Sequence, residues 1–212
     1  MYTYRSEEQW LSNRTRIGGS DAGCILGLCP WKTSSDLWDE KMGIKSPKDL
    51  SDNPLVEYGH KAEEYLRELF KLDFPMMEVL YEPFNMWSND EYPWAHASLD
   101  GWINDGDRLG ILEIKTATIK SKEQGLKWKG QIPQQYYAQV LHYLMVTGSD
   151  FAVVKAQLKY EMDGEVPYLI TRHYFIERKD VEDDIKFLIA KEREFSESLE
   201  KGIRPPTALP DI

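Results

Sequence analysis

The stretch WAHASLDGWINDGDRLGILEIKT, residues 94–116, decides the fold. Residues 94–103 and 108–116 are rich in apolar and β-branched or aromatic side chains that recur at alternate positions, as they do in half-buried strands. Between them, residues 104–107 read Asn-Asp-Gly-Asp, which favours a turn. The sequence therefore predicts two antiparallel strands joined by a four-residue turn.

Three charged side chains of this hairpin are predicted to share one face. Glu113 and Lys115 are two residues apart, so on a strand they point the same way. A four-residue turn sets Asp100 opposite Ile111, on the same face and diagonal to Glu113, about 7–8 Å away at the backbone. Two carboxylates that reach inward from these positions can share a cation.

Such a group suits phosphodiester hydrolysis. Mg²⁺ prefers oxygen ligands and keeps several waters for substrate phosphates, and it lowers the pKa of a bound water. A lysine beside it can orient that water. The alternative is a solvated hairpin face on which Glu113 and Lys115 form an ordinary charge pair. Apolar residues surround the charges on both strands, which favours a half-buried position, where a charge needs a partner or a metal.

The other elements follow from hydrophobic periodicity and from capping and turn residues. Helices are expected over residues 6–13, 20–27, 34–41, 57–71, 134–147 and 180–201, and further strands over residues 79–86, 151–160 and 168–177, the last two joined across residues 162–165. Trp31 and Trp38 are expected in the core. This order indicates an α/β or α+β fold in which helices flank a mixed central sheet.

Length and composition indicate one globular domain. The chain has 212 residues, of which 42% are hydrophobic and 29% charged. Two cysteines, Cys24 and Cys29, no apolar leader and no long apolar stretch indicate a reduced, cytosolic protein without a membrane partner. The net charge of −10 argues against an overall basic DNA-binding surface, although a metal nuclease gathers carboxylates whose charge bound cations partly cancel.

Seven short motifs, in order along the chain, resemble those of one nuclease family. Asp100 and then Glu113-Ile114-Lys115 resemble the D…E-x-K signature of the PD-(D/E)XK nucleases. The other matching pieces are Trp10…Arg14, Ile17-Gly18-Gly19-Ser20-Asp21, Gly27…Pro30-Trp31, Gly59-His60-Lys61-Ala62-Glu63, Ser98-Leu99-Asp100-Gly101 and Tyr136-Tyr137-Ala138-Gln139-Val140. Over most of its length the chain resembles the lambda exonuclease and YqaJ-type viral recombinase family, the phage alkaline exonucleases.

The resemblance implies a fold and a division of the chain. It implies a restriction-endonuclease-like PD-(D/E)XK core within a single nuclease domain over residues 1–212. Residues 57–201 would form the catalytic core. Residues 1–56 would form a helical part that carries a pocket for the 5′-phosphate.

The resemblance also implies roles for residues of the hairpin. Asp100, Glu113 and the backbone carbonyl of Ile114 would bind Mg²⁺ or Mn²⁺, as one or two ions. Lys115 would help to activate the attacking water.

Two helical residues join this group by resemblance. Glu63 matches a helix-borne acidic residue that serves as a further metal ligand beside a second ion, and the neighbouring Glu64 is a rival for that role. Gln139 matches a glutamine that supports the nucleophile or the active site. The alternatives are a solvent-facing glutamate for Glu63 and a structural polar position for Gln139.

Arg14, Ser20 and Ser98 match positions that hold the 5′-phosphate of a DNA end in that family. A hydroxyl and free backbone N–H groups near a helix N-terminus suit an anion, and an arginine fork adds bidentate charge. Arg16 competes with Arg14 for this role, and Ser20 is also a plausible helix N-cap.

By resemblance, the expected function is a metal-dependent exonuclease that degrades linear double-stranded DNA from 5′ to 3′. The 3′ overhangs would serve a single-strand annealing protein in phage-type recombination. A homotrimeric ring around DNA is expected, in the cytoplasm of a bacterial host, encoded by a phage or prophage. Residues 121–130 are polar and lysine-bearing and are expected to be mobile. A basic patch of Lys120, Lys122, Lys127 and Lys129, with Trp128, could grip DNA or be a solvated loop.

Two other functions compete with this one. An endonuclease or a RecB-like repair nuclease of the same superfamily would use the same D…E-x-K residues. A non-catalytic DNA-binding protein on a retired nuclease fold predicts a missing catalytic residue, whereas Asp100, Glu113 and Lys115 are all present.

Overall fold

The structure of the protein, a computed structural model, describes residues 1–162, 164 and 166–206. Its helices are α1 (Glu7–Ser12), α2 (Gly19–Ile25), α3 (Ser34–Lys41), α4 (Pro54–Asp73), α5 (Lys122–Leu126), α6 (Gln134–Thr147) and α7 (Glu182–Lys201), the last preceded by a 3-10 turn, η1 (Arg178–Asp180). Its strands are β1 (Tyr2–Thr3), β2 (Glu78–Leu80), β3 (Asn85–Met86), β4 (Gly101–Asp105), β5 (Arg108–Ile119), β6 (Phe151–Tyr160) and β7 (Tyr168–Glu177). None of the described helices is long and apolar enough to cross a membrane.

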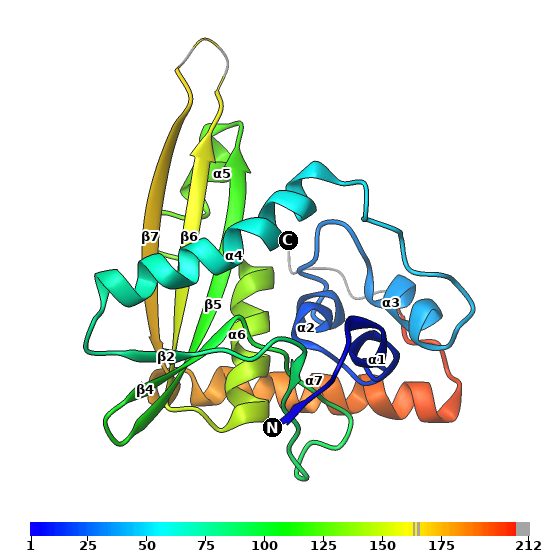
Figure 1. Ribbon diagram of the computed structural model, residues 1–212. Coiled ribbons are helices and arrows are strands. Elements are labelled where there is room, and N and C mark those ends of the chain that lie inside the picture. The colour runs from blue at the N-terminus through cyan, green and yellow to red at the C-terminus, as the bar shows by residue number, and fades with distance from the viewer. Residues whose placement is uncertain (163, 165, 207–212) are drawn as a thin grey trace.

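A five-stranded sheet forms the centre of the molecule (Figure 1). The strand order is β2-β4-β5-β6-β7, and all neighbours are antiparallel except β5 and β6, which are parallel. The chain passes through α6 between these two strands, since parallel neighbours need a crossover connection. The predicted mixed sheet flanked by helices is confirmed. In the turn between β6 and β7, Asp163 and Glu165 lie outside the described residues.

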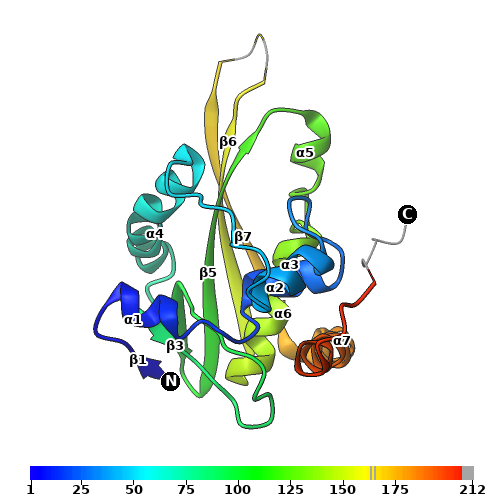
Figure 2. The same ribbon diagram turned by 90° about the vertical axis from the view of Figure 1, so that its right-hand side faces the viewer.

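Helices cover both faces of the sheet (Figure 2). On one face, Leu66 and Phe70 of α4 pack with Leu112 of β5. On the other face, Leu144 of α6 packs with Ile111. α6 is buried from one side to the other because α2 and α7 pack against it away from the sheet. The two faces of β5 therefore meet two different helices, which decides what each of its side chains touches.

The register of the β4–β5 hairpin differs from the predicted one by two residues. Asp105 pairs with Arg108 and Gly101 with Leu112, so the turn has two residues rather than four. Gly106 takes a left-handed φ of +64°, which a short hairpin turn favours and which glycine adopts without a steric penalty. Asp100 therefore adjoins Glu113 directly and not Ile111. A shift of two leaves every side chain on its predicted face.

The strand predicted over residues 79–86 is interrupted. It splits into β2, in the main sheet, and β3, which pairs with β1 in a separate two-stranded sheet. Pro83 and Phe84, whose φ is +57°, lie between them and break the extended chain.

The strand predicted over residues 94–103 belongs to the sheet only from Gly101 onward. Before that residue, isolated β-bridges connect Ala95 to Ile17 and Ala97 to Trp87. This segment has left the sheet to contact the N-terminal part of the chain. Asp100 is thus the last residue before the chain enters the main sheet as β4.

The segment predicted to be mobile, residues 121–130, is anchored. It contains α5, and Trp128 is buried against Tyr136 and Tyr174. The Trp128 carbonyl also accepts hydrogen bonds from Arg172 and from the Tyr174 hydroxyl. Trp128 therefore closes the core and is not available to grip DNA.

The two tryptophans expected in the core have different positions. Trp38 is buried in α3, as predicted. Trp31 is exposed, because it follows Pro30 in the connection between α2 and α3, where the chain runs over the surface.

Candidate active site

The candidate site lies where β5 loses one neighbour. β4 pairs with β5 only as far as Leu112, whereas β6 pairs with it up to Ile119. Beyond Leu112, one edge of β5 has no described strand beside it. Asp100 lies at this edge, and its Oδ2 accepts a hydrogen bond of 2.8 Å from the backbone N–H of Ile114. The N–H and C=O of one strand residue point to the same side, so the Ile114 carbonyl faces this edge as well.

Glu113 is the most buried acid of the group, with 2% of its surface exposed. Its Oε1 lies 2.6 Å from Lys115 Nζ and accepts a hydrogen bond of 2.8 Å from Gln139 Nε2 of α6. Its Oε2 is buried and has no hydrogen-bond partner among the residues that the structure describes. A buried carboxylate oxygen without a partner is costly, and a cation would satisfy it.

The carboxyl groups of this cluster hold their protons more tightly than usual. Burial raises the pKa of Glu113 from 4.5 to about 8, and the Asp100 carboxylate adds to the shift. Burial also raises the pKa of Asp100, and burial followed by repulsion from Asp100 raises that of Glu63 to about 7. Burial alone would lower the pKa of Lys115, but Glu113 and Asp100 outweigh it and raise that pKa. A bound cation favours the charged form of all three acids.

The donor set fits a hard divalent cation. Asp100, Glu113 and the Ile114 carbonyl supply oxygen atoms along one strand edge, and Mg²⁺ takes one or two carboxylates and completes its shell with waters and phosphate oxygens. Within the described residues, no three His, Cys, Asp or Glu side chains are already gathered as a metal-binding group. A site of this kind leaves positions open for substrate rather than enclosing the ion.

Glu63 approaches the cluster from α4 without touching it. It is half-buried and interacts electrostatically with Asp100 and Lys115, whereas its neighbour Glu64 is exposed. Of the two rivals, Glu63 is therefore the one that faces the cluster.

Arg67, which the sequence did not single out, contacts the site directly. It lies one helical turn after Glu63 and is buried. Its Nη1 donates a 2.5 Å hydrogen bond to the Asp100 carbonyl, and its guanidinium lies 3.6 Å from the centre of the Tyr81 ring. Its charge lowers the pKa of both Glu63 and Asp100, although burial raises each of them more. An arginine on the apolar face of an amphipathic helix is the sequence signal that could have revealed it.

The residues expected to bind a 5′-phosphate are only partly brought together. Trp10 Nε1 donates to Ser98 Oγ over 3.1 Å, and the Arg14 guanidinium lies 4.3 Å from the Trp10 ring centre. Trp10 thus joins Arg14 to Ser98. For Arg16, the rival of Arg14, the backbone carbonyl accepts a 2.7 Å hydrogen bond from Lys41 Nζ.

Ser20 is exposed in the first turn of α2, and no hydrogen bond among the described residues joins it to this trio. It is not the N-cap, since Gly18 takes that position and its N–H donates to Asp21 Oδ2 over 3.0 Å.

The paired glycines before Ser20 allow α2 to approach α6 closely. A Cβ on Gly19 would lie 2.3 Å from the Tyr143 ring, which leaves no room for any other residue. The Tyr143 hydroxyl accepts a 2.8 Å hydrogen bond from Gln139, which in turn holds Glu113. A chain of contacts therefore connects the start of α2 with the buried acid.

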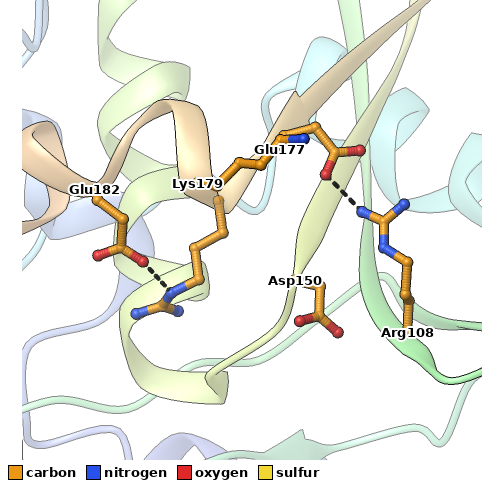
Figure 3. A pocket seen from close by; sticks show the side chains of 6 residues that line it. Arg108, Asp150, Glu177, Lys179 and Glu182 are labelled. Carbon is orange, nitrogen blue, oxygen red and sulfur yellow. Dashed lines mark hydrogen bonds and ion pairs between the residues drawn. The ribbon is translucent and has the colours of Figure 1, made fainter.

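A second ionic cluster lies at the start of β5, away from this site (Figure 3). Arg108 lies 2.6 Å from Glu177, and Arg178 lies 2.7 Å from Glu182. Asp150 accepts a 2.9 Å hydrogen bond from the backbone of β5. Of the charges in this cluster, all except Lys179 have an opposite charge or a backbone donor beside them, so these pairs tie strand ends together.

Comparison with known proteins identifies the same family as the motifs. The YqaJ-like viral recombinase domain matches residues 9–150. The chain is 32% identical over 148 residues to the uncharacterized protein YqaJ of Bacillus subtilis (strain 168), a match that covers 69% of this chain and 44% of that protein. The chain thus spans less than half of this relative's length.

Solved exonuclease structures share the fold. An alkaline exonuclease, LHK-Exo, from Laribacter hongkongensis superposes with a TM-score of 0.66 at 16% identity, over 93% of this chain and 94% of that one. LHK-Exo in complex with dAMP gives a TM-score of 0.63 at 15% identity, over 94% and 97%. A phage related exonuclease from Haemophilus somnus 129PT gives 0.55 at 13% identity, over 92% and 99%. At these identities the likeness concerns the fold.

Proposed function

This chain belongs to the family of YqaJ-like viral recombinase domains, and on that premise we propose that it is a metal-dependent exonuclease acting on linear double-stranded DNA. The observation that carries the proposal is Glu113, whose buried Oε2 accepts no hydrogen bond from any described residue and lies beside a second acid, Asp100, and a lysine. Structural likeness to solved exonucleases supports the same class of reaction.

In this proposal Asp100, Glu113 and the Ile114 carbonyl hold Mg²⁺ or Mn²⁺, with Glu63 beside a second ion. The metal, when bound, activates a water and stabilises the charge that develops on the scissile phosphate. Lys115, fixed by Glu113 and placed 5.0 Å from the Tyr136 ring centre, adds positive charge at that phosphate.

Gln139 is a positioning residue in this proposal. Its amide fixes the Glu113 carboxylate, because it occupies Oε1 and leaves Oε2 directed to the ion. Residues 57–201 act as the catalytic core.

The finer features follow from the family and from the N-terminal part, residues 1–56. Arg14, Ser98 and Ser20 would hold the 5′-phosphate of the DNA end, so digestion would run from 5′ to 3′ and leave 3′ overhangs for a single-strand annealing protein. A ring-shaped homotrimer would keep the enzyme on the duplex. A phage- or prophage-encoded enzyme of this kind would act in the bacterial cytoplasm.

One assay tests these points together. The protein is incubated with linear duplex DNA, with or without a 5′-phosphate, in Mg²⁺ or in EDTA, beside covalently closed circular DNA. We expect metal-dependent loss of linear DNA only, faster with the 5′-phosphate. Cleavage of the closed circle would identify an endonuclease instead, and loss of neither DNA would overturn the catalytic proposal.

A further inference from the structure

A groove of about 1170 Å³ leads away from the candidate site along the open edge of β5. Thr116 and Thr118 of β5 contribute to its floor. Trp31, in the connection between α2 and α3, lines one side, and Leu55 and Tyr58 at the start of α4 line the other. Figure 2 shows α4 and the α2–α3 pair on opposite sides of β5 and β6.

The groove borders the catalytic residues, although none of them is part of its lining. Thr116 follows Lys115 in β5, and Tyr136, whose ring lies 5.0 Å from Lys115 Nζ, also lines the groove. At its other side the groove reaches Ser20 of α2. A polymer that is cut beside Lys115 therefore has this groove as a path for the residues next to the cleaved bond.

The walls of the groove present aromatic and aliphatic side chains more than unpaired charges. Trp31 is 65% exposed, and Leu55 and Tyr58 are exposed as well. Three lysines of the groove have acidic partners: Lys32 pairs with Glu40, Lys45 with Asp36 and Lys159 with Glu161. Lys48 is exposed and has no ion pair among the described residues. A duplex is gripped mainly through its phosphates by unpaired lysines and arginines, whereas unpaired bases stack on aromatic side chains.

We propose that this groove binds single-stranded DNA next to the scissile bond and that Trp31 is its base-stacking platform. The proposal rests on the proposed nuclease function and adds a substrate form and a residue to it. A large ring that stays exposed in a groove loses the stability that burial would give, and a stacked base covers it. Apart from the terminal pair at a duplex end, only an unpaired strand presents base faces to a side chain.

The test measures binding without cleavage. A fluorescein-labelled oligothymidylate is titrated with the full chain in EDTA and followed by anisotropy, for the wild type, Trp31→Ala and Trp31→Tyr. The matched control is Phe187→Ala, since Phe187 is 57% exposed on α7 and does not line the groove. We expect Trp31→Ala to weaken binding about tenfold or more, Trp31→Tyr to stay close to the wild type, and Phe187→Ala to have no effect.

Two results with Trp31→Ala, and one with the wild type, would overturn the groove proposal. Either Trp31→Ala binds the oligonucleotide as tightly as the wild type, or it weakens binding no more than Phe187→Ala does. Glu113→Gln separates this question from the nuclease proposal, because it removes cleavage in Mg²⁺ and leaves oligonucleotide binding in EDTA intact. A wild type that cleaves linear duplex but does not bind the oligonucleotide would reject the groove and keep the nuclease.

Discussion

Two buried glutamates of this chain have opposite surroundings. Glu192 of α7 is 0% exposed, with Oε1 2.7 Å from His142 Nδ1 and Oε2 accepting from Trp94 Nε1 over 3.4 Å. Glu113 is 2% exposed and has two donors on one oxygen and none, in the part of the chain described, on the other. The first acid is satisfied by the protein and holds helices together. The second keeps its negative charge at neutral pH only when a cation is added, which is what distinguishes a metal site from a core contact.

The largest expected effect comes from removing the charge of Glu113. Glu113→Gln should lower the rate of linear DNA cleavage in Mg²⁺ about a thousandfold, since a bound metal contributes several kcal/mol to the transition state. The control is Glu177→Gln, which breaks only the surface pair with Arg108 and should cleave like the wild type. Equal cleavage rates for both variants would show that the Glu113 cluster is no more important for catalysis than the surface pair of Glu177 and Arg108.

Removing the other buried glutamate should affect folding instead. Glu192→Ala leaves His142 buried without its charged partner and should lower the free energy of unfolding by about 3–5 kcal/mol. Cleavage per folded molecule should stay near the wild-type value, because Glu192 does not contact the candidate site. Denaturant unfolding and active-site-normalised cleavage measure the two quantities, and a stable but inactive variant would contradict the comparison.

A substitution of Arg67 should sharpen the comparison further, since Arg67 holds the Asp100 backbone carbonyl by a hydrogen bond. Arg67→Met should weaken Mn²⁺ binding about tenfold, the effect usual for groups that orient metal ligands. Arg67→Lys keeps the charge but not the guanidinium plane over Tyr81 and should recover part of the loss. Calorimetric titration measures the affinities, and an unchanged affinity in Arg67→Met would show that the hydrogen bond to Asp100 matters only for the fold.

A further effect is expected in the pH dependence of stability. The pKa of Glu113 in the folded protein, about 8, lies above its ordinary value of 4.5, so the folded state keeps a proton that the unfolded state releases. In EDTA, this group should therefore lower the free energy of unfolding progressively between about pH 4.5 and about pH 8.

Glu113→Gln lacks this contribution and should lose less stability over the same pH range, and Mg²⁺ should reduce the loss in the wild type. Chemical denaturation at several pH values measures it. A difference between wild type and variant that does not change with pH would contradict this reading of the buried acid.

Much of the central fold could be predicted because the signals are local. Alternating apolar residues give β5, β6 and β7, and the spacing of Glu113 and Lys115 fixes their common face. The register of the hairpin could not be predicted, because a two-residue turn at Gly106 competes with a four-residue one and both keep the pattern.

The features that escaped prediction depend on distant contacts. The position of Arg67 on the apolar face of α4 predicts that it is buried, but not which residue it contacts; it reaches Asp100 because α4 crosses the sheet there. Trp31 is exposed although its hydrophobicity favours the core. It follows Pro30 in the connection between α2 and α3, which runs along the surface. Trp128 is buried although the polar segment around it suggested a loop. Its ring packs between Tyr136 of α6 and Tyr174 of β7.

The most direct measurement is a calorimetric titration of Mn²⁺ into the DNA-free protein, for the wild type, Glu113→Gln and Glu177→Gln. The buried Glu113 oxygen, to which no described residue donates, predicts saturable Mn²⁺ binding to the wild type and to Glu177→Gln, and loss of binding in Glu113→Gln. Equal binding by all three proteins, or binding by none, would contradict a cation site at the edge of β5.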